Sequence, residues 1–79
     1  MKIYYSKKSL KYLKTLDTIT CQRIREAIKN FPLGDVVKLH GRKNEYRLRV
    51  GNFRVLFEIE DDIIKIYKVG PRGQVYKGI

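Results

Sequence analysis

The segment "EYRLRVGNFRVLFEI", residues 45–59, carries the clearest structural pattern in the chain. Apolar and polar residues alternate along it, and Gly51-Asn52 near its middle is typical of a two-residue turn between antiparallel strands. With such a turn, Val50 lies opposite Phe53, and the apolar residues of both strands share one face. The segment therefore predicts a β-hairpin with one apolar face.

Three arginines share the other face of this predicted hairpin. Arg49 is expected directly opposite Arg54, and Arg47 lies on the diagonal. Like charges in such positions destabilise a sheet by tenths of a kcal/mol up to about 1 kcal/mol. Glu45 and Glu58 are the only carboxylates expected on this face. Two interpretations are open: a solvated charged face, or a site for an anion such as phosphate, which planar guanidinium groups bind in a bidentate way.

A third strand is predicted at residues 63–69, "IIKIYKV", after an Asp-Asp turn. It completes a three-stranded antiparallel β-meander. If the pairing continues without an irregularity, Glu58 pairs with Lys65, and Val69 lies opposite Arg54.

The tail is predicted to add to the arginine face. A Gly-Pro pair is expected to turn the chain so that Arg72 returns toward Arg54, with Tyr76 four residues further on. Tyr67 is expected on the arginine side of the third strand. The candidate site therefore consists of Arg47, Arg49, Arg54, Arg72, Tyr67 and Tyr76. Arginines interleaved with aromatic rings are the composition expected for binding single-stranded RNA.

The first half of the chain predicts one strand and a helical hairpin. Residues 2–5 form a short β-type run, and residues 7–16 and 19–31 carry apolar side chains at helical spacing. Ser6 is the predicted N-cap of the first helix, and Asp17 can cap the second.

The order of these elements predicts an α+β domain. A further short strand could form at residues 36–39, in the connection that leads to the hairpin. The fold expected is an N-terminal strand, an α-helical hairpin and the three-stranded meander, with the helices on one face of the sheet. The 79 residues suffice for one domain, residues 1–79.

The charge balance narrows the class of partner. Eighteen Lys and Arg against eight Asp and Glu give a net charge of +10. Such a charge favours association with nucleic acid, an acidic protein or an anionic membrane surface.

The chain carries no sign of export. Cys21 is the single cysteine, so no intramolecular disulfide can form, and neither a signal peptide nor a membrane-spanning segment is present. A cytoplasmic location is therefore predicted. Cys21 is expected to be a half-buried helix residue and His40 an exposed loop residue.

The ordered set "YRLRVGNFRVLFEI", an acidic turn, a strand and "VGPRGQVY" resembles the RelE/ParE superfamily of type II toxins, and more narrowly its RelE branch. The resemblance covers nearly the whole chain. It implies the RelE-like microbial RNase-type fold and a ribosome-dependent, metal-independent endoribonuclease that cleaves mRNA in the ribosomal A site. The implied partners are a cognate RelB-like antitoxin and the 70S ribosome with its mRNA, with no membrane, metal ion or small-molecule cofactor.

The same resemblance implies roles for individual residues. The family's functional arginine matches Arg54, its basic residues match Arg47 and Arg49, and the arginine and tyrosine of the tail match Arg72 and Tyr76. The chain departs from the family at Glu45, where a basic residue is common, and at "GPR", where many relatives have "GHR". The tail from Arg72 is also shorter than in the best-known member.

Cleavage of RNA without a metal ion needs a base for the 2′-hydroxyl, stabilisation of the phosphorane charge and a proton for the leaving oxygen. Tyr76 is the predicted base, since nearby cations favour its phenolate, and whether Tyr76 or Tyr67 lies nearer the reacting phosphate stays open. Arg54 and Arg72 would stabilise the charge, while Arg47 and Arg49 would hold the phosphate. Lys7, Lys11 and Lys14 form either a solvated helix face or a grip on ribosomal RNA.

Two other functions fit the same fold: a ParE-like inhibitor of DNA gyrase, and a non-catalytic module that binds an antitoxin. The arginine–tyrosine set favours the nuclease. On that hypothesis, Arg54→Ala is expected to leave folding intact or slightly improved while it abolishes activity, because it relieves repulsion within the cluster.

Overall fold

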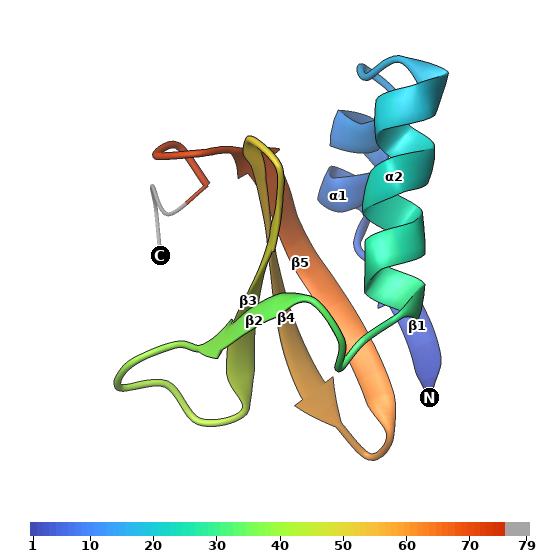
Figure 1. Ribbon diagram of the computed structural model, residues 1–79. Helices are drawn as coiled ribbons and strands as arrows, with labels where there is room; N and C mark the ends of the chain where they lie inside the picture. The colour runs from blue at the N-terminus through green and yellow to red at the C-terminus, as the bar shows by residue number, and fades with distance from the viewer. Residues whose placement is uncertain (76–79) are drawn as a thin grey trace.

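The computed structural model describes residues 1–75. Its elements are β1 (Lys2–Tyr5), α1 (Lys7–Leu13), α2 (Thr18–Lys29), β2 (Asp35–Lys38), β3 (Glu45–Val50), β4 (Phe53–Glu60) and β5 (Ile63–Pro71). The strands form one sheet in the order β1-β5-β4-β3-β2, and both helices lie on one of its faces (Figure 1). The predicted α+β class and its layering are therefore confirmed.

The sheet is wider than the meander that the sequence predicts. Strands β3, β4 and β5 are antiparallel neighbours, as expected. β1 adds to one edge, parallel to β5, and β2 adds to the other, antiparallel to β3. Both edge strands have four residues, so the meander forms the centre of a five-stranded mixed sheet.

Both predicted helix caps are present. The Ser6 hydroxyl accepts a hydrogen bond from the Ser9 amide at 3.1 Å. The Asp17 carboxylate accepts one from the Thr20 amide at 3.0 Å. Each bond satisfies a backbone donor that the first helical turn leaves free. The helices end at Leu13 and Lys29, which is earlier than the apolar spacing predicts.

The main core lies between the helices and the sheet. Ile24 and Ile28 of α2 are almost fully buried, together with Leu13 of α1. The sheet contributes Leu48, Val50, Val55, Phe57, Ile64, Ile66 and Val69. The strand residues alternate as the period of two requires, so the predicted apolar face of the hairpin is the face that the helices cover.

One register prediction is wrong. The pairing of β4 with β5 shifts between Leu56 and Phe57, so that Gly70 lies opposite Arg54, and Val69 lies opposite Val55. An extra residue in one strand produces such a shift, and turn chemistry does not reveal it.

A second correction concerns Lys65. It lies opposite Glu58 as predicted, but its ammonium group pairs with Glu60 at 2.6 Å.

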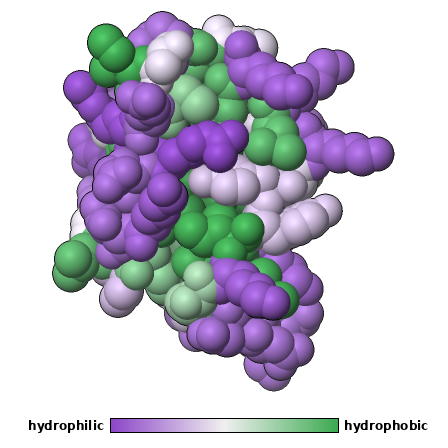
Figure 2. All heavy atoms as spheres, turned by 90° about the vertical axis from the view of Figure 1, so that its right-hand side faces the viewer, coloured by the Kyte–Doolittle hydropathy of each residue, from purple (hydrophilic) through white to green (hydrophobic). Residues whose placement is uncertain are grey.

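The predictions for Cys21 and His40 are confirmed. Cys21 is half-buried against the core, and His40 is exposed in the connection between β2 and β3. No helix within residues 1–75 is long and apolar enough to span a membrane. The helix-bearing side is covered largely by hydrophilic side chains around smaller hydrophobic areas (Figure 2).

Candidate nucleic-acid interface

The face of the sheet turned away from the helices, called the open face here, carries the predicted arginines. Arg49 of β3 lies directly opposite Arg54 of β4, and Arg47 lies opposite Leu56, two positions along. Asp35 of β2 lies opposite Arg49, and Gly70 of β5 lies opposite Arg54. Asp35, Arg49, Arg54 and Gly70 therefore form one row of cross-strand neighbours across β2, β3, β4 and β5.

Asp35 corrects the prediction that Glu45 and Glu58 are the only carboxylates on this face. Its Oδ1 accepts a hydrogen bond from Arg47 Nη2 at 3.1 Å, and its Oδ2 lies 3.9 Å from Arg49 Nη1. The pairing of β2 with β3, which joins residues far apart in sequence, brings this carboxylate in. Part of the predicted repulsion is thereby neutralised.

Arg54 differs sharply from the other arginines, because its relative exposure is only 5%. Its Nη1 donates hydrogen bonds to the carbonyl oxygens of Gly51 at 3.2 Å and Phe53 at 3.1 Å. The side chains of Arg47 and Arg49 are 19% and 50% exposed. Arg54 therefore stabilises the hairpin turn, while Arg49 is half-exposed and Arg47 partly exposed on the open face.

The tail returns to the open face, but not through the predicted Gly-Pro turn: Gly70 and Pro71 still pair with Arg54 and Phe53 in β5, and the turn follows Pro71. The Arg72 amide donates to the Asn52 carbonyl at 2.8 Å, which places exposed Arg72 beside the hairpin turn. The amide of Val75 then donates to the Pro71 carbonyl at 3.2 Å and closes a turn. The red end of the ribbon leaves β5 on the side away from the helices (Figure 1).

Val75 covers the middle of the open face. A Cβ atom added to Gly70 would lie 3.6 Å from Val75 Cα, so the two residues are in close contact. Gly70 is the cross-strand partner of Arg54, so Val75 packs on the strand position next to Arg54. Val75 and Leu56 are fully buried, although neither belongs to the main core.

The predicted Tyr76 lies outside the described residues. Tyr67 lies on the arginine side as expected, and its hydroxyl donates to Glu45 Oε1 at 2.7 Å. Burial, followed by the bond to this carboxylate, raises the pKa of the Tyr67 hydroxyl far above its ordinary value. Tyr67 therefore stays protonated at neutral pH and is a poor base, although its ring can contact RNA.

The three predicted lysines are not part of the arginine cluster. Lys7 and Lys11 belong to α1, Lys14 is its C-cap residue, and all three are exposed. Since α1 covers the opposite face of the sheet, these lysines cannot contact the phosphate that the arginines would bind.

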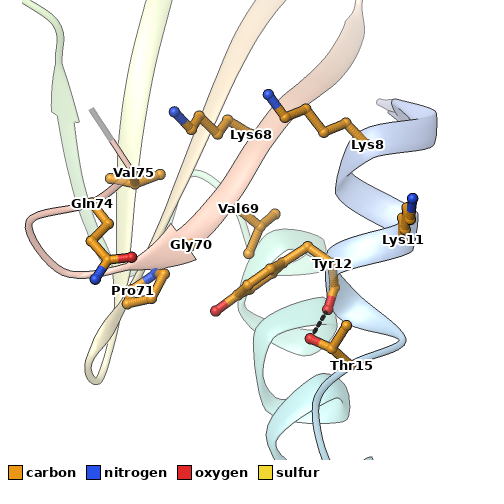
Figure 3. Close-up of a pocket in the computed structure, with 10 residues that line it drawn as sticks. All are labelled: Lys8, Lys11, Tyr12, Thr15, Lys68, Val69, Gly70, Pro71, Gln74 and Val75. Carbon is orange, nitrogen blue, oxygen red and sulfur yellow. Dashed lines mark hydrogen bonds between the residues drawn. The ribbon is translucent and has the colours of Figure 1, made fainter. Parts of the chain in front are cut away.

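A groove of about 400 Å³ separates α1 from the C-terminal half of β5. Its walls include Tyr12, Val69 and Pro71, and Lys8 and Lys68 extend at one end of it (Figure 3). β1 pairs with β5 only as far as Ile66. Beyond Ile66, no strand within residues 1–75 pairs with the outer edge of β5.

The structure thus brings Arg47 and Arg49 together around Asp35, holds the backbone of exposed Arg72 beside the hairpin turn, and buries Arg54. Sequence analysis missed Asp35 and Val75. The signal for Asp35 was a carboxylate just before the possible strand at residues 36–39. The signal for Val75, an isolated valine in a Gly-rich tail, was weak. Within residues 1–75, no group of three or more His, Cys, Asp or Glu side chains could hold a metal ion.

Comparison with known proteins agrees with this architecture. Residues 3–76 match the profile described as the ParE toxin of the type II toxin-antitoxin system parDE. Toxin RelE3 of Methanocaldococcus jannaschii is 31% identical, with 96% of each chain covered. Putative toxin RelE1 of the same organism is 32% identical, over 90% of this chain and 89% of the relative.

Solved structures show the same likeness. A chain of the RelB-RelE antitoxin-toxin complex from Methanococcus jannaschii superposes with a TM-score of 0.76 at 31% identity, over 92% of this chain and 94% of that one. A chain of the archaeal RelE-RelB complex from Pyrococcus horikoshii OT3 gives a TM-score of 0.75 at 31% identity, over 92% and 96%.

Proposed function

Because this chain belongs to the RelE/ParE superfamily of type II toxins, we propose that it is a RelE-like endoribonuclease that cleaves mRNA in the ribosomal A site without a metal ion. The observation that carries this proposal is the pair Arg47 and Arg49 on the open face, with Arg72 held beside the adjacent hairpin turn. Positive charge suits an RNA phosphate, and a planar guanidinium group can donate to two of its oxygens.

The role proposed for each arginine follows from its exposure. Arg47 and Arg49 hold the scissile or flanking phosphate, and Arg72, which the backbone ladder fixes beside the turn, stabilises the charge that develops on it. Arg54 supports this geometry from below, since its guanidinium group already donates to two carbonyl oxygens. Its 5% exposure leaves little of the group open to a phosphate.

Tyr76 is the proposed general base, and the substrate's own 2′-hydroxyl is the nucleophile. In this mechanism the base removes the hydroxyl proton and the 2′-oxygen attacks the adjacent phosphorus. The bond to the 5′-oxygen breaks as Arg72, which is exposed, gives that oxygen a proton, and a 2′,3′-cyclic phosphate remains. A site with so few proton-transfer groups relies on positioning of the substrate for much of its rate. That reliance supports a requirement for mRNA held by the ribosome.

An antitoxin is the proposed protein partner, as in the RelB-RelE complexes of the similar chains. The groove between α1 and β5 offers an apolar floor, and Lys8, Lys11 and Lys68 supply positive charge at its rim. An extended acidic or amphipathic segment could pair with the outer edge of β5 there.

The nuclease proposal can be tested with purified protein and translating ribosomes, by mapping mRNA ends with primer extension. Cuts are expected within translated codons, and Arg49→Ala should reduce the cleavage rate about tenfold or more. Lys29→Ala is the matched control, because it removes one exposed positive charge from α2, on the other side of the sheet. It should cleave at nearly the wild-type rate.

The match to a ParE profile specifies the competing function. Intact mRNA together with accumulated gyrase–DNA breaks would reject the nuclease in favour of a gyrase inhibitor. A chain that binds antitoxin but causes neither effect would be a non-catalytic module.

A further inference from the structure

Asp35 contacts both arginines of β3, Arg47 and Arg49. Its two carboxylate oxygens contact different guanidinium groups, Oδ1 that of Arg47 at 3.1 Å and Oδ2 that of Arg49 at 3.9 Å. A phosphate held by the same two side chains would use two of its oxygens in the same way. The carboxylate and the phosphate therefore require the same donors.

Arg47 depends strongly on this contact. Four-fifths of its side chain is buried, with 19% exposed, and its Nε is buried without a hydrogen-bond acceptor in the part of the chain that the structure describes. A largely buried guanidinium group that lacks acceptors is stabilised by contact with an anion. In the unbound protein that anion is the Asp35 carboxylate.

The position of Asp35 allows the contact to open. It is the first residue of β2, an edge strand of four residues that pairs on one side only, with β3. The Asp35 side chain is 49% exposed, so water can replace the arginines around its carboxylate. Its withdrawal would cost little backbone structure.

We propose that Asp35 is an internal competitor for the RNA phosphate: its carboxylate occupies the Arg47–Arg49 donors in the unbound protein and must leave them when RNA binds. Asp35 is thus a positioning residue that limits the affinity of the toxin for RNA in general. RNA that the ribosome holds in place displaces it, whereas free RNA competes poorly. This inference rests on the proposed role of the arginines in RNA binding.

The experiment measures binding of a short single-stranded 2′-O-methyl RNA, which cannot be cleaved, by fluorescence anisotropy. Asp35→Asn removes the competing charge and keeps the shape of the side chain. It should tighten binding at least about threefold more than the control Glu60→Gln.

Glu60→Gln is a matched control because it changes the net charge equally, at an exposed carboxylate that pairs with Lys65 instead of the arginines. In an Arg47→Ala background, the excess effect of Asp35→Asn should disappear. Asp35→Glu, which keeps the charge, should bind RNA like the wild type. Circular dichroism confirms that each variant is folded.

Equal tightening by Asp35→Asn and Glu60→Gln would overturn the proposal, since net charge alone would then explain both. Weaker binding by folded Asp35→Asn would overturn it as well, because Asp35 would then only hold the arginines in place. The assay does not depend on cleavage. A toxin that fails to cut mRNA but shows the Asp35 effect would refute the nuclease and leave this inference standing.

Discussion

Arg54 and Arg49 are cross-strand neighbours with the same charge, yet their environments differ. Arg49 is half-exposed, whereas Arg54 is 5% exposed and donates to two backbone carbonyl oxygens. Removal of the Arg54 side chain deletes two part-buried hydrogen bonds and the packing of a buried stem, at a cost of about 1–3 kcal/mol. Relief of the repulsion from Arg49 returns at most about 1 kcal/mol. Burial therefore outweighs repulsion, which reverses the expectation drawn from the sequence.

Arg54→Ala should accordingly lower the free energy of unfolding by about 2 kcal/mol, because a buried arginine also loses the packing of its stem. Urea denaturation measures this loss. Arg49→Ala is the control and should stay within about 0.5 kcal/mol of the wild type. An Arg54→Ala protein as stable as the wild type would show that Arg54 is retained for function alone.

At the scale of elements, the end of β5 and the turn after it form one unit. Gly70 ends the row of open-face residues and leaves space that Val75 fills, with Val75 Cα 3.6 Å from a Cβ at Gly70. Val75 and Leu56 are buried there, on the face opposite the helices. The tail thus protects the centre of an otherwise open sheet.

Substitutions of increasing size at Gly70 test this arrangement. Gly70→Ala places Cβ at ordinary contact distance and should leave stability unchanged or raise it by up to about 1 kcal/mol. Gly70→Leu has no room and should expel Val75, which costs about 1–3 kcal/mol. Chemical denaturation gives both values, and faster amide exchange at Val75 in Gly70→Leu alone shows that the tail has moved. Similar exchange in both variants would contradict the packing described.

At the scale of the whole molecule, positive charge is distributed over two sides of the sheet. The arginines lie on the open face, and Lys7 and Lys14 lie with α1 on the other side. A single RNA strand cannot contact both sides closely. The net charge of +10 therefore suits a surface enclosed by nucleic acid, as a ribosomal site is.

The double variant Lys7→Gln/Lys14→Gln tests whether the helix side of the molecule contributes to ribosome binding but not to the binding of short RNA. It should keep the affinity for a short uncleavable RNA within about twofold, since the proposed RNA site lies on the arginine face, and lower the affinity for ribosomes about tenfold. Anisotropy and ribosome sedimentation measure the two affinities. If ribosome binding is unchanged, the lysines are a solvated helix face. An equal loss for both ligands would place the helix side in contact with free RNA.

Much of the fold follows from patterns only a few residues long. The two-residue turn at Gly51-Asn52 sets the register of β3 and β4, so the Arg49–Arg54 pair was predictable. Ser6 and Asp17 cap the helices through bonds to amides three residues ahead, which sequence spacing also reveals. These features involve near neighbours, and local stereochemistry is enough to specify them.

The environment of the arginines required the folded chain. Asp35 meets Arg47 because β2 joins the edge of the sheet, the bulge in the β4–β5 pairing places Gly70 opposite Arg54, and the returning tail packs Val75 against Gly70. Each contact depends on how strands and tail pack together, and no short pattern encodes such packing. The sequence therefore located the arginines, while long-range packing determined which are exposed, which is paired and which is buried.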